Sequence, residues 1–313
     1  MYRGKSIGVV VPAYNEELLI GRVLENMPAY VDKVYVVDDC SIDKTINVVR
    51  SKRNFRVVIQ RHKKNLGVGA AIVTGYRRAL QDRLDIVAVM AGDDQMDPGE
   101  LNKLLDPIVE GQADYSKGDR LSRRGLAAGM STWRKFGNSL LTQLTRISSG
   151  YWLVQDPQNG YTAISREALN GLDLGSIYRG YGYCNDLLAK LNVLGLRVLD
   201  VPIPARYGEE KSKIRYGSYM RKVSFLLLRN FLWRIVVQYI YPRPKLPGVG
   251  YLSGFLFLSA GMSTLLASIL ARPNIKTGVL LFLTGVLQII LSLALDAFMR
   301  LKVSRTSPFD DYG

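Results

Sequence analysis

The stretch DIVAVMAGDDQMDP, residues 85–98, joins a buried strand pattern to a cluster of acids. Its first half is almost entirely apolar, which is typical of a strand buried on both faces. Acids at the end of a buried strand indicate a binding site, and a divalent cation is the first ligand to consider. An acid-x-acid pair ending at Asp93 is missing, however, because Ala91 occupies its first position.

The chain upstream of this stretch alternates between strand and helix patterns. The strand patterns lie at 6–14, 33–39, 55–60 and 85–91, and the helix patterns that follow them lie at 16–27, 43–52, 67–80 and 99–111. This alternation predicts an α/β fold with a mainly parallel, Rossmann-like sheet and helices on both faces. Ligands of such sheets bind at the carboxyl ends of the strands. Polar residues fall there at 14–16, at 38–39 and at Asp93.

The glycine-rich stretch NLGVGAAIVTG, residues 65–75, has to be weighed as a dinucleotide site. It does not match that fingerprint, because Ile72 stands where the third glycine belongs and because the stretch follows the third strand pattern rather than the first. We therefore interpret Gly67 and Gly69 as positions of a tight turn and of close helix packing.

Composition argues against several classes of protein. The chain has 313 residues, with 42 Lys and Arg against 27 Asp and Glu and a formal net charge of +15. Two cysteines make no disulfide framework, and the single histidine, His62, argues against zinc chemistry and a Ser-His-Asp triad. The first apolar run is too short for a secretory signal, so we expect a cytoplasmic first domain.

The last third of the chain is of a different kind. Residues 249–271 and 277–299 each exceed the roughly 20 apolar residues that cross a bilayer. A third segment, 223–241, is interrupted by Arg229 and Arg234. It either lies in the interface or spans the bilayer with its arginines facing a polar cavity.

These segments define the expected domains. We predict a cytoplasmic domain over 1–217 and a domain of an interface helix and transmembrane helices over 218–313, which makes the chain an integral membrane protein. A basic cluster at 209–222 directly precedes the first segment, where anionic lipid is a nearer partner than nucleic acid. Asp296 lies near the end of the last segment, and we expect it to reach the interface.

Five motifs occur in an order that resembles family 2 glycosyltransferases, which are inverting enzymes with the GT-A fold. The motifs are VVVPAYNEE (9–17), VVDDCSIDKT (36–45), NLGVGAAIVTGY (65–76), GDDQ (92–95) and DPQNGYTAISREAL (156–169). The resemblance covers residues from about 7 to 214. The basic stretch at 117–135 and the segment RYGEEKSKI, 206–214, make the chain most similar to the polyprenyl-phosphate branch, typified by dolichyl-phosphate mannose synthase.

The resemblance implies an activity. We expect a hexose, and first of all mannose from GDP-mannose, to be transferred to dolichyl or polyprenyl phosphate for protein glycosylation. The alternative donors are UDP-glucose and UDP-N-acetylglucosamine, and the alternative acceptor is a hydroxyl of a lipid-linked oligosaccharide. A protein that keeps the fold but has lost turnover is the non-catalytic alternative.

The resemblance also implies a binding site for the nucleotide sugar. Its residues are Pro12, Tyr14, Glu16, Val37, Asp39, Ala91, Gly92, Asp93, Lys117 and Arg206. The first three would surround the base and ribose, and Asp39 would accept a hydrogen bond from the base. A Mn or Mg ion would be held by Asp93 and Gln95, because the diphosphate and water supply its remaining ligands.

The acceptor site is expected to be basic. The residues implied for the lipid phosphate are Arg120, Arg134, Ser212 and Lys213. A phosphate monoester is largely dianionic at neutral pH and hardly needs a general base, whereas a hydroxyl does. Asp156 and Asp186 are the candidate bases. Their alternative interpretations are a turn residue before Pro157 and charge compensation at a helix N-terminus.

Overall fold

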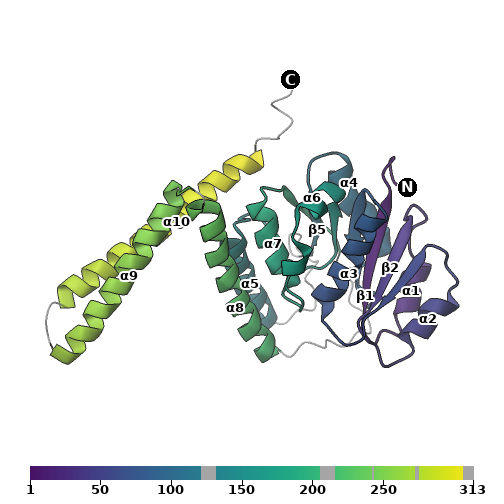
Figure 1. Ribbon diagram of the computed structural model, residues 1–313, viewed down its shortest axis with the longest axis horizontal. Helices are drawn as coiled ribbons and strands as arrows, with labels where there is room; N and C mark the ends of the chain where they lie inside the picture. Colours follow the sequence, from purple (N-terminus) through teal and green to yellow (C-terminus); the bar gives the residue numbers. More distant parts are fainter. Residues whose placement is uncertain (121–131, 205–215, 242, 272–274, 306–313) are drawn as a thin grey trace, which may run out of the picture. The chain divides into compact units, whose positions relative to one another are not determined.

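The computed structural model describes residues 1–120, 132–204, 216–241, 243–271 and 275–305. The chain divides into two compact units, Met1–Leu227 and Leu228–Gly313. The first unit contains a twisted sheet covered by helices, and the second contains long helices (Figure 1).

The sheet of the first unit has seven strands in the order β3-β2-β1-β4-β6-β5-β7 within the described residues. The strands are β1 (Ile7–Ala13), β2 (Lys33–Asp38), β3 (Val57–Arg61), β4 (Ile86–Val89), β5 (Tyr115–Asp119), β6 (Thr162–Ser165) and β7 (Val198–Pro202). Only β6 is antiparallel to its neighbours, β4 and β5. The expected mainly parallel α/β sheet is therefore confirmed.

Helices cover both faces of this sheet. One face carries α1 (Ile20–Glu25), α2 (Thr45–Ser51) and α4 (Leu101–Val109), and the other carries α3 (Val68–Gln81), α6 (Arg166–Gly171) and α7 (Tyr183–Val193). Alternate residues of a strand point to opposite faces, so Val9 and Val11 belong to one apolar cluster and Val10 to the other. Each buried side chain of this kind contributes about 1.5–3 kcal/mol, which makes the two clusters the main source of stability.

The glycine-rich stretch packs closely, as interpreted from the sequence. Gly67 begins the turn into α3 with φ of 96°, and a Cβ on it would lie 2.5 Å from the carbonyl oxygen of Arg179. A Cβ on Gly69 would lie 2.2 Å from the carbonyl oxygen of Tyr178. The glycines therefore let the segment 178–180 approach the start of α3.

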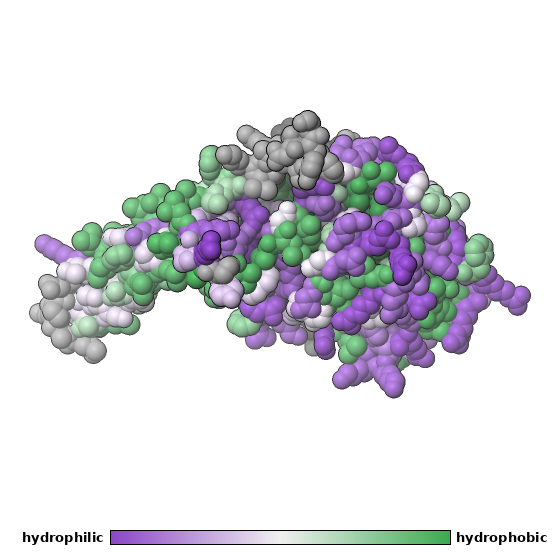
Figure 2. Space-filling view, turned by 45° about the horizontal axis from the view of Figure 1, so that its top comes forward, coloured by the Kyte–Doolittle hydropathy of each residue, from purple (hydrophilic) through white to green (hydrophobic). Residues whose placement is uncertain are grey.

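Within the described residues, three helices have the length and composition of membrane spans. The first span, Tyr219–Ile240, consists of most of α8 (Tyr216–Ile235) and a π-helical turn, η3 (Val236–Ile240). The second, Leu246–Ser268, lies in α9 (Leu246–Ala271), and the third, Ile275–Arg300, lies in α10 (Ile275–Arg305). Figure 2 shows apolar residues over the surface of α9 and α10. The close packing of these two helices depends on glycines, since a Cβ on Gly261 would lie 2.5 Å from the backbone nitrogen of Phe282.

A charged pair is buried inside the second unit. Arg234 and Asp296 are both 0% exposed. Their guanidinium and carboxylate meet through two hydrogen bonds, Nη1 to Oδ1 at 3.0 Å and Nη2 to Oδ2 at 2.7 Å, and the Tyr239 hydroxyl donates to the same carboxylate. The expectation that Asp296 reaches the interface is therefore wrong, because the carboxylate turns inward to its partner.

Candidate active site at the carboxyl edge of the sheet

The loops that follow β1 and β2 are bonded to each other. The backbone N–H of Asn15 donates to Ser41 Oγ at 2.9 Å, and that of Glu16 donates to Thr45 Oγ1 at 2.8 Å. Asn15 and Cys40 both have left-handed backbones, with φ of 55° and 67°. Non-glycine residues in this region are uncommon and persist where surrounding contacts hold them. The two loops therefore form one rigid surface at the carboxyl edge.

Four residues expected around the nucleotide lie at this edge. Pro12 and Val37 are register partners at the ends of β1 and β2, and both are buried. Tyr14 follows β1 with 37% of its surface exposed, and Glu16 is partly buried beside it. The structure thus brings together residues separated by more than twenty positions in the sequence.

Asp39 lies buried at the end of β2 and receives three hydrogen bonds. Its Oδ1 accepts from the backbone N–H of Leu66 at 2.8 Å and contacts His62 Nδ1 at 2.7 Å. Its Oδ2 accepts from the backbone N–H of Gly67 at 2.8 Å. The other ring nitrogen of His62 contacts Thr74 Oγ1 at 2.9 Å. Sequence reasoning assigned His62 no role, although the only histidine directly follows a strand at this edge.

The loop after β4 contains the candidate metal ligands. Asp93 and Gln95 are both partly buried, and the backbone N–H of Gln95 donates to Asp93 Oδ1 at 3.2 Å. The backbone N–H of Gly92 donates to the Pro12 carbonyl at 3.2 Å, which fixes the loop against β1. Asp97 caps the turn η1 (Pro98–Glu100) by accepting from Gly99 N–H at 2.9 Å.

The chemistry of this loop fits a hard divalent cation. A carboxylate and an amide are oxygen donors, which Mg²⁺ and Mn²⁺ accept. No group of three or more His, Cys, Asp and Glu residues that suits a metal occurs in the described part of the chain. An ion held by Asp93 and Gln95 would therefore take most of its ligands from a diphosphate and from water.

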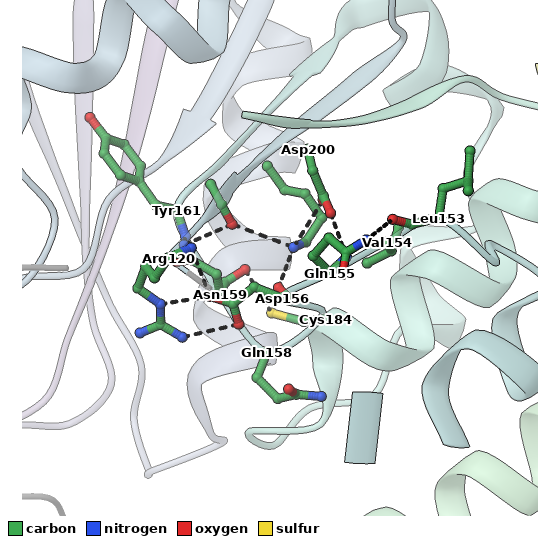
Figure 3. A network of polar contacts seen from close by, with 12 residues as sticks. Arg120, Leu153, Val154, Gln155, Asp156, Gln158, Asn159, Tyr161, Cys184 and Asp200 are labelled. Atoms are coloured by element: carbon green, nitrogen blue, oxygen red, sulfur yellow. Dashed lines mark hydrogen bonds and ion pairs between the residues drawn. The ribbon is translucent and has the colours of Figure 1, made fainter. Parts of the chain in front are cut away.

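Asp156 is the centre of a polar network before β6 (Figure 3). It is 2% exposed, and its two carboxylate oxygens accept from Arg120 Nε at 2.7 Å and Nη2 at 3.2 Å. Its backbone carbonyl accepts from the ammonium group of Lys117, which also pairs with Asp200 at 3.5 Å. Burial raises the pKa of Asp200, and the charge of Lys117 opposes that rise.

Lys117 in β5 and Arg120, which directly follows this strand, make different contacts. Lys117 is 1% exposed and supports the loop that contains Asp156. Arg120 remains 38% exposed while Asp156 orients its guanidinium. The roles of both residues toward phosphate groups stay predictions.

Asp186 is fully buried in the first turn of α7. It accepts from the backbone N–H of Tyr178 at 2.8 Å and from Lys190 Nζ at 2.7 Å. These bonds hold the segment that covers Gly67 and Gly69. Both candidate bases, Asp156 and Asp186, therefore have cationic partners inside the protein.

A pocket lies between the loop after β4 and the polar network around Asp156. It is lined by Gln95, Met96, Asp97, Glu100, Arg120, Asn159, Tyr161, Ile203 and Pro204. A candidate metal ligand and a candidate phosphate ligand thus face the same space. Arg206, Ser212 and Lys213, and the side chain of Arg134, lie outside the described residues.

The chain is similar to known glycosyltransferases in sequence. The family model "Glycosyl transferase family 2" matches residues 8–172. The UDP-N-acetylglucosamine–dolichyl-phosphate N-acetylglucosaminyltransferase of Methanococcus voltae is 30% identical over 220 residues, which cover 66% of this chain and 87% of the relative. The undecaprenyl-phosphate mannosyltransferase of Micrococcus luteus is 30% identical over 201 residues, which cover 62% and 81%.

The fold is similar to that of a solved enzyme. Glucosyl-3-phosphoglycerate synthase from Mycobacterium tuberculosis, crystallised with Mn²⁺, UDP-glucose and phosphoglyceric acid, is 25% identical with a TM-score of 0.54. The match covers 74% of this chain and 80% of that structure. Sequence and fold comparisons thus agree with the motif order read from the sequence.

Proposed function

This chain belongs to glycosyltransferase family 2, and on that premise we propose that it is a membrane-bound, metal-dependent enzyme that transfers a hexose from a nucleotide sugar to a polyprenyl phosphate. The strongest support is that Gln95, a candidate metal ligand, and Arg120, a candidate phosphate ligand, line the same pocket. The described part of the chain also has three helices long and apolar enough to cross a membrane. The catalytic domain, residues 1–217, is proposed to face the cytoplasm, and residues 218–313 to hold it at the lipid.

The residues at the carboxyl edge have separate tasks in this reaction. Asp93 and Gln95 would hold the divalent cation, Mn or Mg, and the chemistry it would supply is neutralisation of the charge on the leaving nucleoside diphosphate. Tyr14 and Glu16 bind the nucleoside, and Asp39 receives a hydrogen bond from the base. Arg120, oriented by Asp156, binds a phosphate group in the shared pocket.

A phosphate acceptor fits the two buried carboxylates better than a hydroxyl acceptor does. Asp156 is paired with Arg120 and Asp186 with Lys190, so both carboxylates are already engaged by cationic partners inside the protein. A dianionic phosphate attacks the sugar from the face opposite the leaving group without giving up a proton.

Three donors have support from relatives or from the solved neighbour. The mannosyltransferase of Micrococcus luteus supports the sequence-based expectation of mannose from GDP-mannose. The N-acetylglucosaminyltransferase of Methanococcus voltae supports UDP-N-acetylglucosamine. UDP-glucose remains the third donor, since the solved neighbour was crystallised with it.

The purified full-length protein should form a labelled lipid from dolichyl phosphate, Mn²⁺ and at least one of three radiolabelled donors: GDP-mannose, UDP-N-acetylglucosamine and UDP-glucose. Dolichol, which lacks the phosphate, is the matched control and should give no product. Chromatography of the extracted lipid measures the result. The absence of lipid-linked product with every donor would refute the proposed function.

Replacement of Asp186 by Asn should reduce turnover by less than about tenfold, because loss of a true general base costs about 10²–10⁴-fold. Asn keeps an acceptor for the Tyr178 N–H, and the double variant Asp186→Asn/Lys190→Gln removes the charge left on the lysine. The rate of the wild-type protein and of Asp186→Asn should fall below pH 6, following the second ionisation of the lipid phosphate at about pH 6. A complete loss of turnover with unchanged lipid binding would show that the acceptor is a hydroxyl.

A further inference from the structure

Asp39 has one acceptor position left for a ligand. An ionised carboxylate has about four lone-pair sites, two on each oxygen. His62 Nδ1 and the Leu66 N–H occupy both sites of Oδ1, at 2.7 and 2.8 Å. The Gly67 N–H occupies one site of Oδ2 at 2.8 Å. A ligand therefore finds a single site, on Oδ2.

His62 cannot turn away from Asp39 without also losing its contact with Thr74. Because the carboxylate only accepts, the imidazole donates from Nδ1, and its Nε2 is then free to accept the Thr74 hydroxyl proton at 2.9 Å. The imidazole side chain is 9% exposed and that of Asp39 4%. The backbone N–H of His62 also donates to the Asp38 carbonyl at 2.9 Å. The ring is thus held between the end of β2 and the helix α3.

The number of remaining acceptor sites distinguishes the two bases that the proposed function leaves open. Guanine presents two adjacent donors, its ring N–H and its amino group, and this pair matches a carboxylate with both oxygens available. Uracil presents one ring N–H between two carbonyl groups. A carboxylate with one site left satisfies uracil and leaves a guanine donor without a partner in a buried place, which is costly.

We propose, resting on the proposed function, that the donor is a uridine diphosphate sugar and that His62 sets this preference by occupying Asp39 Oδ1. His62 acts through Asp39 and is a positioning residue. The preference for UDP over GDP should be at least about tenfold, since an unpaired buried donor lowers affinity by that order.

The test is a titration of the full-length protein with UDP and with GDP in the presence of Mn²⁺, measured by calorimetry. The wild-type protein should bind UDP at least about tenfold more tightly. His62→Leu, which returns one site on Oδ1, should bring the ratio of the two affinities towards one. His62→Asn retains an N–H donor near the position of Nδ1 and should keep the wild-type ratio.

Thr74→Val is the matched control. It removes the hydroxyl on the far side of the imidazole but leaves the contact between His62 and Asp39, so the ratio should not change. Thermal melting of each variant checks that it is folded. If His62→Leu does not fold, the wild-type ratio still decides the assignment of uracil, and His62→Ala replaces His62→Leu as the test of the role of His62.

The results test the assignment of uracil and the role of His62 separately. Equal or tighter binding of GDP by the wild-type protein would overturn the assignment of uracil. A preference for UDP that survives in folded His62→Leu would overturn the role of His62. Binding of neither nucleotide, together with no lipid-linked product, would instead show that the proposed function itself is wrong.

Discussion

Replacement of Asp93 by alanine should lower turnover by at least about 10²-fold, the usual cost of removing one group that stabilises developing charge. Asp93 is the candidate metal ligand in the loop after β4, and Ala91 offers no second carboxylate to replace it. Gln95→Ala should have a smaller effect and raise the Mn²⁺ concentration needed for half-maximal rate. Both are measured with the lipid-product assay across a range of Mn²⁺ concentrations.

The neighbouring acid provides the control for this prediction. Asp94 has a left-handed backbone with φ of 59°, which asparagine tolerates, so Asp94→Asn keeps the loop geometry and should change turnover little. Thermal melting should be similar for all three variants because Asp93 and Gln95 are only partly buried. Turnover of Asp93→Ala close to the wild-type value in the presence of a chelator would mean that the acids are structural.

The first four strands could be predicted because each is a short apolar run. Their observed bounds differ from the expected ones by only a few residues. The helix expected from residue 16 begins at Ile20 instead. The backbone N–H groups of Glu16 and Glu17 donate to Thr45 and Asp43, so these two residues are bonded to the neighbouring loop, and the turn that leads into the helix starts from the Glu16 carbonyl.

Strand β5 shows why the rest of the sheet was not predicted. It reads YSKGD and has no apolar pattern, yet all five residues are buried. Ser116 donates to the Leu104 carbonyl at 2.5 Å, and Lys117 pairs with Asp200. Partners far away in the sequence satisfy these polar groups, and periodicity within a strand contains no information about them.

Part of the candidate site could also be predicted from the positions of the strands. Residues that directly follow strands were identified, since parallel strands bring their carboxyl ends together. The pairing of Arg120 with Asp156, and the bond from His62 to Asp39, depend on how separate loops meet. Sequence analysis assigned separate roles to Arg120 and Asp156 and no role to His62, and the structure places each pair in contact.

Replacement of Asp296 by alanine should destabilise the membrane unit by about 3–5 kcal/mol, the usual cost of removing one partner of a buried ion pair. The variant takes away the carboxylate that receives two N–H groups of Arg234 and the hydroxyl of Tyr239. The arginine charge then stays buried without its carboxylate partner, although Gln238 Oε1 still accepts from its Nη1 at 3.3 Å. Thermal unfolding in detergent micelles, followed by circular dichroism, should show a clear fall in melting temperature.

The double variant Arg234→Met/Asp296→Leu distinguishes a cost of unpaired charge from a need for the ion pair itself. Apolar side chains of similar size often replace a buried pair without loss of stability. The double variant should therefore recover most of the melting temperature lost in Asp296→Ala, and UDP binding by the first unit should remain in both. If the single variant is as stable as the wild type, the pair does not stabilise the helices. If the double variant melts as early as the single one, the charges are needed for the packing of α8 and η3 against α10.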